Sequence, residues 1–338
     1  MSVKVAINGF GRIGRAFVRA AVHDPKIELV AINDLGEIDN LAYLLQYDSV
    51  YRRFPAQIKV EGGDLVIGAK PVKFLSVKDP AQLPWGQLGV DVVIESTGVF
   101  DSFEKSQAHI TAGAKRVVIT APVKDELQNA ATVLVGVNED KLQNVTVTSN
   151  ASCTTNSASP LIAILDESIG IEKALLNTVH AYTATQSLVD APVKGSDKRR
   201  GRAAAQNIVP SSTGAAVAVT KAYPNLSGLF DGVSVRVPTV SGSLVDITFV
   251  AKRATTAEEV NDILRKAALE PRWQGIFAAS DEPLVSGDII GTEHASIADL
   301  EMTRVVGGTL VKVMAWYDNE MGYAHTLLRH VQLLGAHI

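Results

Sequence analysis

The chain has 338 residues, of which 46% are hydrophobic and 20% charged, and its formal net charge is −4. A chain of this length usually folds as two domains, and its slight acidity argues against nucleic acid or an anionic membrane as a primary partner. A single cysteine excludes an internal disulfide. Because the first residues lack a signal-peptide pattern and no apolar run reaches the roughly 18 residues that span a bilayer, we expect a soluble, cytoplasmic protein.

Strands and helices alternate in the first 150 residues. Short β-branched runs predict buried strands at residues 3–9, 27–34, 90–98, 115–122 and 132–138. Helical spacing of apolar residues predicts helices at residues 12–24, 38–48 and 102–113. This alternation predicts an α/β domain with a doubly wound, Rossmann-type parallel sheet that is covered on both faces.

After about residue 150, long strands dominate and helices become fewer. Strands are predicted at residues 174–183, 231–239, 243–253 and 304–320, and helices after Pro160 and at residues 214–223, 256–269 and 321–335. Strands that follow strands predict an α+β domain with a mostly antiparallel mixed sheet and helices on one face. We expect a first domain at 1–152, a second at 153–318, and a C-terminal helix at 319–338 that packs back on the first.

A glycine pattern follows the first predicted strand. Residues 8–15, NGFGRIGR, place Gly9, Gly11 and Gly14 as in the dinucleotide fingerprint, where they permit a tight turn, the approach of a pyrophosphate and close helix–strand packing. Asp34 lies 20 residues after Gly14, where a carboxylate accepts hydrogen bonds from the adenosine ribose. The alternative is a glycine-rich turn beside a surface aspartate, but context and spacing together favour a dinucleotide site.

The only cysteine, Cys153, stands in the polar stretch SNASCTTN. A lone cysteine is usually a buried structural residue, yet these neighbours are capping residues rather than core residues. A position near a helix N-terminus lowers the pKa of a thiol and favours the thiolate. A nucleophilic cysteine needs a base, and His180, at the end of an apolar strand, is the best candidate, although a histidine in that position is more often structural.

Eight blocks, in chain order, resemble the phosphorylating glyceraldehyde-3-phosphate dehydrogenase family: INGFGRIGR, IND, ESTGVF, SNASCTTN, VHAYTATQ, PSSTGAA, RVPT and WYDNEMGY. The resemblance covers essentially the whole chain. It implies that Cys153 attacks the aldehyde of glyceraldehyde 3-phosphate while His180 acts as base and stabilises the oxyanion. Hydride then passes to NAD, and inorganic phosphate releases 1,3-bisphosphoglycerate from the thioacyl enzyme. It also implies a homotetramer and no metal.

The resemblance assigns further site residues. Those implied to contact the cofactor are Asn8, Gly9, Arg12, Ile13, Asp34, Lys78, Thr97, Gly98, Thr120, Asn319 and Tyr323. Those implied to bind the substrate phosphate are Thr183, Arg199 and Arg236, and those for the attacking phosphate are Ser152, Thr154, Thr213 and Gly214. By local sequence alone, Thr97-Gly98 fits a plain turn as well as a cofactor contact. Arginine forks and a helix N-terminus both suit phosphate oxygens.

Several alternatives stay open. The loop PVKGSDKRRGR is one residue longer than in many relatives, so either Arg199 or Arg200 reaches phosphate. Erythrose 4-phosphate fits the same motifs, and an RNA-binding protein without catalysis is a remote alternative. Asp34 favours NAD over NADP because it repels a 2′-phosphate, unless Lys194 and Lys198 offset that repulsion.

Overall fold

The structure is a computed structural model that describes residues 2–193 and 196–338. The chain forms two compact units. The first unit comprises residues 1–135, 139–151 and 324–338, and the second comprises residues 136–138 and 152–323. The domain boundaries predicted after residues 152 and 318 refer to functional domains rather than to these compact units, and they remain a prediction.

The first unit is built on a nine-stranded sheet in the order β10-β11-β9-β8-β1-β2-β7-β6-β5. The strands from β10 to β7 are parallel, and β6 and β5 continue the sheet antiparallel. Their bounds are β1 (Val3–Asn8), β2 (Ile27–Asn33), β5 (Ile58–Glu61), β6 (Asp64–Ile67), β7 (Lys70–Leu75), β8 (Val92–Glu95), β9 (Arg116–Ile119), β10 (Ala130–Thr132) and β11 (Val147–Ser149). The predicted Rossmann-type parallel sheet is confirmed.

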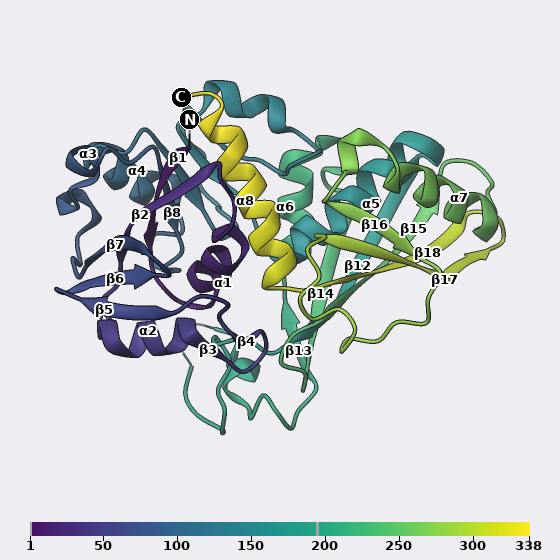
Figure 1. Cartoon of the computed structure of the whole chain (residues 1–338). Helices are drawn as coiled ribbons and strands as arrows, with labels where there is room; N and C mark the ends of the chain where they lie inside the picture. The colour runs from purple at the N-terminus through teal and green to yellow at the C-terminus, as the bar shows by residue number, and fades with distance from the viewer. Residues whose placement is uncertain (1, 194–195) are drawn as a thin grey trace. The chain divides into compact units, whose positions relative to one another are not determined.

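Helices cover both faces of this sheet (Figure 1). One apolar core includes Phe17 of α1, Leu45 of α2 and Leu327 of α8, and the other includes Trp85 of α3 and Phe103 of α4. Burial on both faces is the reason that these strands are continuously apolar. The helices are α1 (Arg12–Ala21), α2 (Ile38–Gln46), α3 (Trp85–Leu88), α4 (Phe103–Thr111) and α8 (Met321–Gly335), with β3 (Tyr47–Asp48) and β4 (Arg52–Arg53) as a small hairpin and η1 (Pro80–Gln82) and η2 (Glu139–Asn144) as 3-10 turns.

The second unit contains a seven-stranded sheet in the order β13-β14-β12-β15-β18-β17-β16. Four of its six pairings are antiparallel, and the β12–β14 and β16–β17 pairings are parallel. The strands are β12 (Ile171–Ala181), β13 (Val209–Ser212), β14 (Phe230–Val237), β15 (Ser243–Ala251), β16 (Phe277–Ser280), β17 (Ser296–Val306) and β18 (Leu310–Tyr317). The predicted mostly antiparallel mixed sheet is confirmed.

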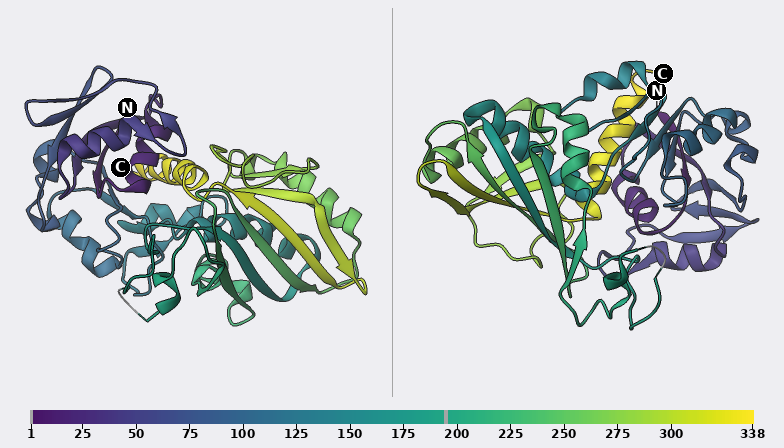
Figure 2. Two further views of the ribbon diagram at one scale, coloured as in Figure 1. Left: turned by 90° about the horizontal axis from the view of Figure 1, so that it is seen from below. Right: turned by 180° about the vertical axis from the view of Figure 1, so that it is seen from behind.

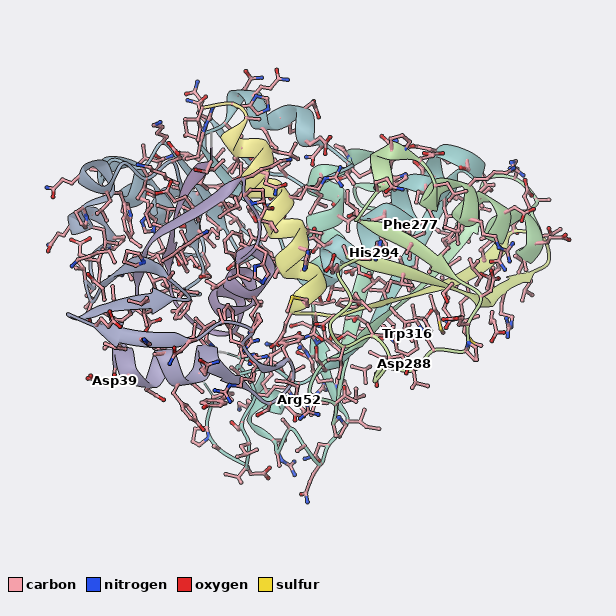
Figure 3. All side chains as sticks on the ribbon, viewed as in Figure 1. Asp39, Arg52, Phe277, Asp288, His294 and Trp316 are labelled. Carbon is pink, nitrogen blue, oxygen red and sulfur yellow. The ribbon has the colours of Figure 1, made fainter. Side chains whose placement is uncertain are left out.

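Three helices pack together on one face of this sheet (Figures 1 and 2). They are α5 (Cys153–Ile169), α6 (Ala215–Ala222) and α7 (Ala257–Ala268), and the 3-10 turns are η3 (Lys198–Gly201), η4 (Pro224–Leu226) and η5 (Pro271–Trp273). The strands alternate accordingly: in β18, Val313 and Ala315 are buried, whereas Met314 and Trp316 are half-exposed. Trp316 is labelled in Figure 3. Such alternation marks a sheet with one covered and one open face.

Two expectations about elements were wrong, and two strands were missed. Of the strand predicted at 132–138, only Thr132 is in a strand, and Gly136 turns the chain with φ +82°. The strand predicted at 304–320 is a hairpin, because Gly307 and Gly308 have φ of +59° and +78° and form the turn between β17 and β18. The antiparallel strands at residues 58–67 were not predicted.

Within the described ranges, no helix has the length and apolar character that crossing a membrane requires.

Candidate active site

The glycine loop of the first unit has the geometry that its sequence pattern demands. Gly9 has φ +97°, and a Cβ there would lie 2.5 Å from the Thr97 nitrogen. A Cβ on Gly14 would lie 2.5 Å from the Gly9 carbonyl oxygen, so the helix start and the loop pack too closely for a side chain. At Gly11, which precedes α1, a Cβ would meet no atom within 4 Å. The loop therefore leaves room in front of a helix N-terminus, which suits a pyrophosphate.

Asp34 is tied to this loop. Its Oδ2 accepts a hydrogen bond from the Phe10 backbone N–H at 2.6 Å, and its Oδ1 accepts one from the Gly36 N–H at 2.8 Å. The carboxylate follows directly after β2, at the carboxyl edge of the sheet where ligands of such folds bind. This is a position from which a ribose hydroxyl can be bound.

Other predicted cofactor residues lie on the same edge. Asn8 and Thr97 both donate to the carboxylate of Glu95, and Thr120 donates to the Glu95 carbonyl oxygen. Arg12 forms an ion pair with Asp48 at 2.5 Å. Ile13 lies in the first turn of α1, Gly98 has φ +69°, and Lys78 is exposed. Lys194 lies outside the described residues, and Lys198 is exposed in η3.

Asn319 and Tyr323 belong to the second unit, and both are buried. The Asn319 Oδ1 accepts a hydrogen bond from the Ser243 hydroxyl at 2.9 Å, and the Ser243 Oγ accepts one from the Ala181 N–H at 3.1 Å. Ser243 thus connects the amide of Asn319 to the residue after His180. The sequence motifs contained no signal for Ser243.

Cys153 is the first residue of α5. Ser152 caps the helix, because its hydroxyl accepts a hydrogen bond from the Thr155 N–H at 3.1 Å. Ala151, before the cap, has φ +53°, which is uncommon for a residue with a side chain and concentrates at functional sites. The Cys153 Sγ lies 3.4 Å from the His180 Nε2, within reach for proton transfer.

His180, near the end of β12, is enclosed by three groups. Its Nδ1 lies 2.7 Å from the Ala181 carbonyl oxygen and 2.8 Å from the Arg236 Nη1, and its ring meets Tyr317 edge-on. The carbonyl needs a proton on Nδ1, whereas the guanidinium needs a lone pair there. When Nδ1 carries the proton and donates it to the Ala181 carbonyl, the Nε2 lone pair faces the sulfur and can accept the thiol proton. When Arg236 donates to Nδ1 instead, the proton of the neutral ring is on Nε2.

The pKa shifts of this pair differ from the sequence-based expectation. Burial raises the pKa of the Cys153 thiol, although the charge of Arg236 and the Thr154 N–H act to lower it. Burial, with a contribution from Arg236, lowers the pKa of His180 to about 3. The expectation of a lowered thiol pKa was therefore wrong for the free protein, because desolvation outweighs the helix N-terminus. The resting pair is a thiol beside a neutral imidazole.

A cluster of hydroxyl and guanidinium groups lies in the same unit. The Arg200 Nη1 donates to the Thr185 Oγ1 at 3.1 Å, and Thr185 is 3.0 Å from the Thr183 hydroxyl. Burial lowers the pKa of both His180 and Arg236, and the charge of Arg200 adds to both shifts, whereas Arg199 is exposed. Of the two arginines that the sequence left open, Arg200 is the one in this cluster.

Predicted contacts of the attacking phosphate have other partners here. The Thr154 hydroxyl is bonded to the Tyr317 hydroxyl at 2.8 Å, and both are buried. The Thr213 hydroxyl accepts from the Ala215 N–H at 3.2 Å, and Gly214 precedes α6. Among the described residues, no group of three or more His, Cys, Asp and Glu side chains suits a metal ion.

A nucleotide-type glycine loop in one unit and a cysteine–histidine pair in the other are the features expected of a dinucleotide-dependent enzyme with a nucleophilic thiol. Two family models match the chain. Residues 3–103 match the NAD binding domain of glyceraldehyde 3-phosphate dehydrogenase, and residues 152–319 match its C-terminal domain.

Curated relatives match nearly the whole chain. Glyceraldehyde-3-phosphate dehydrogenase 1 of Bacillus subtilis (strain 168) is 48% identical over 330 residues, which is 97% of each chain. Glyceraldehyde-3-phosphate dehydrogenase 1 of Streptomyces avermitilis is 48% identical over 338 residues, 99% of each, and glyceraldehyde-3-phosphate dehydrogenase of Geobacillus stearothermophilus is 48% identical over 330 residues, 97% of each. The chain therefore belongs to the glyceraldehyde 3-phosphate dehydrogenase family, and its first unit carries that family's NAD-binding domain.

Proposed function

We propose that this protein oxidises glyceraldehyde 3-phosphate to 1,3-bisphosphoglycerate with NAD and inorganic phosphate, as a glycolytic enzyme. The observation that carries the proposal is the 3.4 Å contact between the Cys153 Sγ and the His180 Nε2 at the start of α5. The family assignment supplies the substrate class, and the paired thiol and imidazole supply the chemistry.

The first step is attack of the Cys153 sulfur on the aldehyde carbon. The thiol proton leaves as the C–S bond forms, and the aldehyde oxygen becomes the hemithioacetal oxygen. His180 serves this step as a proton acceptor and as a donor to the developing oxyanion through Nε2. The Ala181 carbonyl, 2.7 Å from Nδ1, stabilises the protonated ring. The buried, neutral resting pair means that charge develops only as the reaction proceeds.

The residues of the glycine loop fit NAD. Gly9 and Gly11 leave room for the pyrophosphate, and Asp34 would bind the adenosine ribose hydroxyls. Asn319, oriented by Ser243, would hold the nicotinamide carboxamide. NAD, when bound, accepts the hydride that converts the hemithioacetal into a thioester. The thioester retains oxidation energy, and inorganic phosphate then displaces Cys153 as a thiolate to give the acyl phosphate.

The substrate phosphate is assigned to Arg236, Thr183 and Arg200. The Nε–H of Arg236 is buried and meets no acceptor in the described parts of the chain, which is costly unless an anion supplies one. Guanidinium groups match phosphate oxygens in a fork geometry. Arg200 is proposed in place of Arg199, because Arg200 contacts Thr185 whereas Arg199 is exposed. Ser152, Thr154, Thr213 and Gly214 remain proposed for the attacking phosphate.

A homotetramer in the cytoplasm is proposed as the working form. The open face of the seven-stranded sheet supports association, since it presents apolar residues such as Leu175 on β12 and Val233 on β14, which are 66% and 56% exposed. Apolar side chains on an open sheet face favour contact with another chain. The measurement is the mass in solution by light scattering.

Two alternative functions can be distinguished from the proposed one by assay. Erythrose 4-phosphate is also a phosphorylated 2-hydroxy aldehyde, so the kcat/KM for each aldehyde decides between the two. We expect glyceraldehyde 3-phosphate to be preferred, with NAD reduction dependent on inorganic phosphate. Tight, salt-sensitive RNA binding without turnover of either aldehyde would instead indicate the non-catalytic alternative, which the intact Cys153–His180 pair argues against.

A further inference from the structure

Glu95, the last residue of β8, has a buried carboxylate that none of the roles above uses. It is 2% exposed. In the sheet register Glu95 is opposite Asn8, the last residue of β1, and Asn8 is opposite Asn33, the last residue of β2. Three polar residues thus form a row along the carboxyl edge of the parallel sheet, directly behind the glycine loop.

The hydrogen bonds of this row have a fixed direction. The Val77 backbone determines the orientation of the Asn33 amide, because the Val77 N–H donates to the Asn33 Oδ1 and the Val77 carbonyl accepts from the Asn33 Nδ2, each at 2.9 Å. The Asn33 Nδ2 also donates to the Asn8 Oδ1 at 2.7 Å. The Asn8 Nδ2 must therefore be the donor toward the Glu95 Oε2, at 2.6 Å.

A second path of fixed direction reaches Glu95 from the opposite side. The indole N–H of Trp85 can only donate, and it lies 3.0 Å from the His109 Nδ1. Nδ1 must then present its lone pair, so the His109 proton is on Nε2 and the ring is neutral. This Nε2 lies 3.0 Å from the same Glu95 Oε2 and donates to it. Trp85 and His109 are fully buried, so water does not offer them other partners.

The other carboxylate oxygen binds Thr97. The Glu95 Oε1 accepts from the Thr97 N–H at 2.8 Å and lies 2.5 Å from the Thr97 hydroxyl. Glu95 is thus the common acceptor of donors that arrive from both sides, and the Oε2 in particular faces two groups that can only donate. A carboxylate satisfies all of them, whereas an amide of the same shape cannot.

We propose that Glu95 is the positioning residue of the nucleotide-binding edge, with Trp85 and His109 fixing its role as acceptor. It acts through Asn8 and Thr97, which are proposed to contact NAD and which its two oxygens hold in place. The inference rests on the proposed function, because it takes NAD as the ligand of that edge.

The test is Glu95→Gln, which keeps the shape and replaces one acceptor by a donor. The amide nitrogen must face either Asn8 and His109, which both donate, or the Thr97 N–H, so each placement opposes at least one donor. We expect the Kd for NAD, measured by calorimetry, to rise by about 10- to 100-fold. The kcat at saturating NAD should stay within about threefold, since the thiol and its base are not altered. Glu61→Gln, the same change at an exposed site of β5, is the matched control and should bind NAD as the unmodified protein does.

A second readout needs neither NAD nor turnover. The chain has three tryptophans, so the indole N–H signals of the ¹⁵N-labelled protein are few, and Trp85→Phe assigns the one of Trp85. In Glu95→Gln this signal should shift in either placement, because His109 loses the negative charge of its acceptor and, when the amide nitrogen faces it, the acceptor itself. A lower NAD affinity without that shift would remove His109 and Trp85 from the proposal. If Glu95→Gln binds NAD with unchanged affinity, the proposal is wrong, regardless of any shift in the Trp85 indole N–H signal.

If Glu95→Gln does not fold, Trp85→Phe takes its place. That change removes the donor that fixes the His109 tautomer, and His109 is linked to Thr97 through Glu95 by two further hydrogen bonds. A severalfold rise in the Kd for NAD supports the positioning role, and an unchanged Kd contradicts it. Absence of NAD binding by the unmodified protein would instead contradict the proposed function itself.

Discussion

Replacing His180 by asparagine tests how the thiol is activated. The Cys153 Sγ and the His180 Nε2 are 3.4 Å apart. At an effective dielectric constant of about 20, a thiolate and an imidazolium at that distance attract one another by about 5 kcal/mol. Arg236, 2.8 Å from the Nδ1, opposes the imidazolium and reduces the net gain. Loss of the base should lower turnover by about 10²- to 10⁴-fold, which corresponds to about 2.7–5.4 kcal/mol.

The assay has two parts. Initial rates of NAD reduction at saturating glyceraldehyde 3-phosphate and phosphate give the loss of turnover. The rate of alkylation of Cys153 by iodoacetamide, a neutral reagent, is then followed against pH. In His180→Asn the alkylation profile should move to higher pH, because burial already raises the pKa of the thiol and the imidazole no longer accepts its proton.

His294→Asn is the matched control, since His294 is a partly buried histidine of the same unit outside the proposed site (Figure 3). It should leave both turnover and the alkylation profile nearly unchanged. If His180→Asn behaves like this control, the thiol is activated without His180 and the proposed pairing is wrong.

Three further changes test other parts of the account. Asp34→Ala should narrow the preference for NAD over NADP, which repulsion and lost ribose bonds set at about 2–4 kcal/mol or about 30- to 1000-fold in kcat/KM; an unchanged ratio would show that another residue sets the preference. Arg200→Gln should lower kcat/KM for glyceraldehyde 3-phosphate by about 10- to 100-fold while Arg199→Gln has little effect, and the reverse order would restore Arg199 as the phosphate residue. Burial lowers the pKa of His330 to about 3, so between pH 6.5 and 3 the unfolded chain binds a proton at this residue that the folded chain does not. The urea midpoint of unfolding should therefore fall as the pH is lowered through this range. His330→Gln should make that fall shallower, and an equal fall in the variant would assign it to other groups.

Much of the fold followed from local patterns. The Gly9-x-Gly11-x-x-Gly14 turn needs glycine for reasons internal to the loop, and so its geometry could be predicted. Helix caps are equally local, since the hydroxyl of Thr256, the residue before α7, accepts from the Glu259 N–H.

The remaining features depend on distant neighbours. The direction of the Cys153 pKa shift could not be predicted, because desolvation depends on the packing of β12, β14 and β18 around the thiol. The choice between Arg199 and Arg200 depends on the path of a loop. The role of Glu95 as an acceptor depends on hydrogen bonds among residues of β1, α3, α4 and β8, which the fold brings together, and no local sequence pattern predicts these contacts.

The most direct test of the account is the mass of the protein after it is mixed with glyceraldehyde 3-phosphate and NAD in phosphate-free buffer and quenched in acid. We expect one added phosphoglyceroyl group per chain, located on the peptide that contains Cys153, with one equivalent of NADH formed. Addition of inorganic phosphate before the quench should remove the group, and Cys153→Ala should never acquire it. NADH formation by Cys153→Ala at the normal rate, or steady turnover without any acyl group on Cys153, would contradict the thioester mechanism.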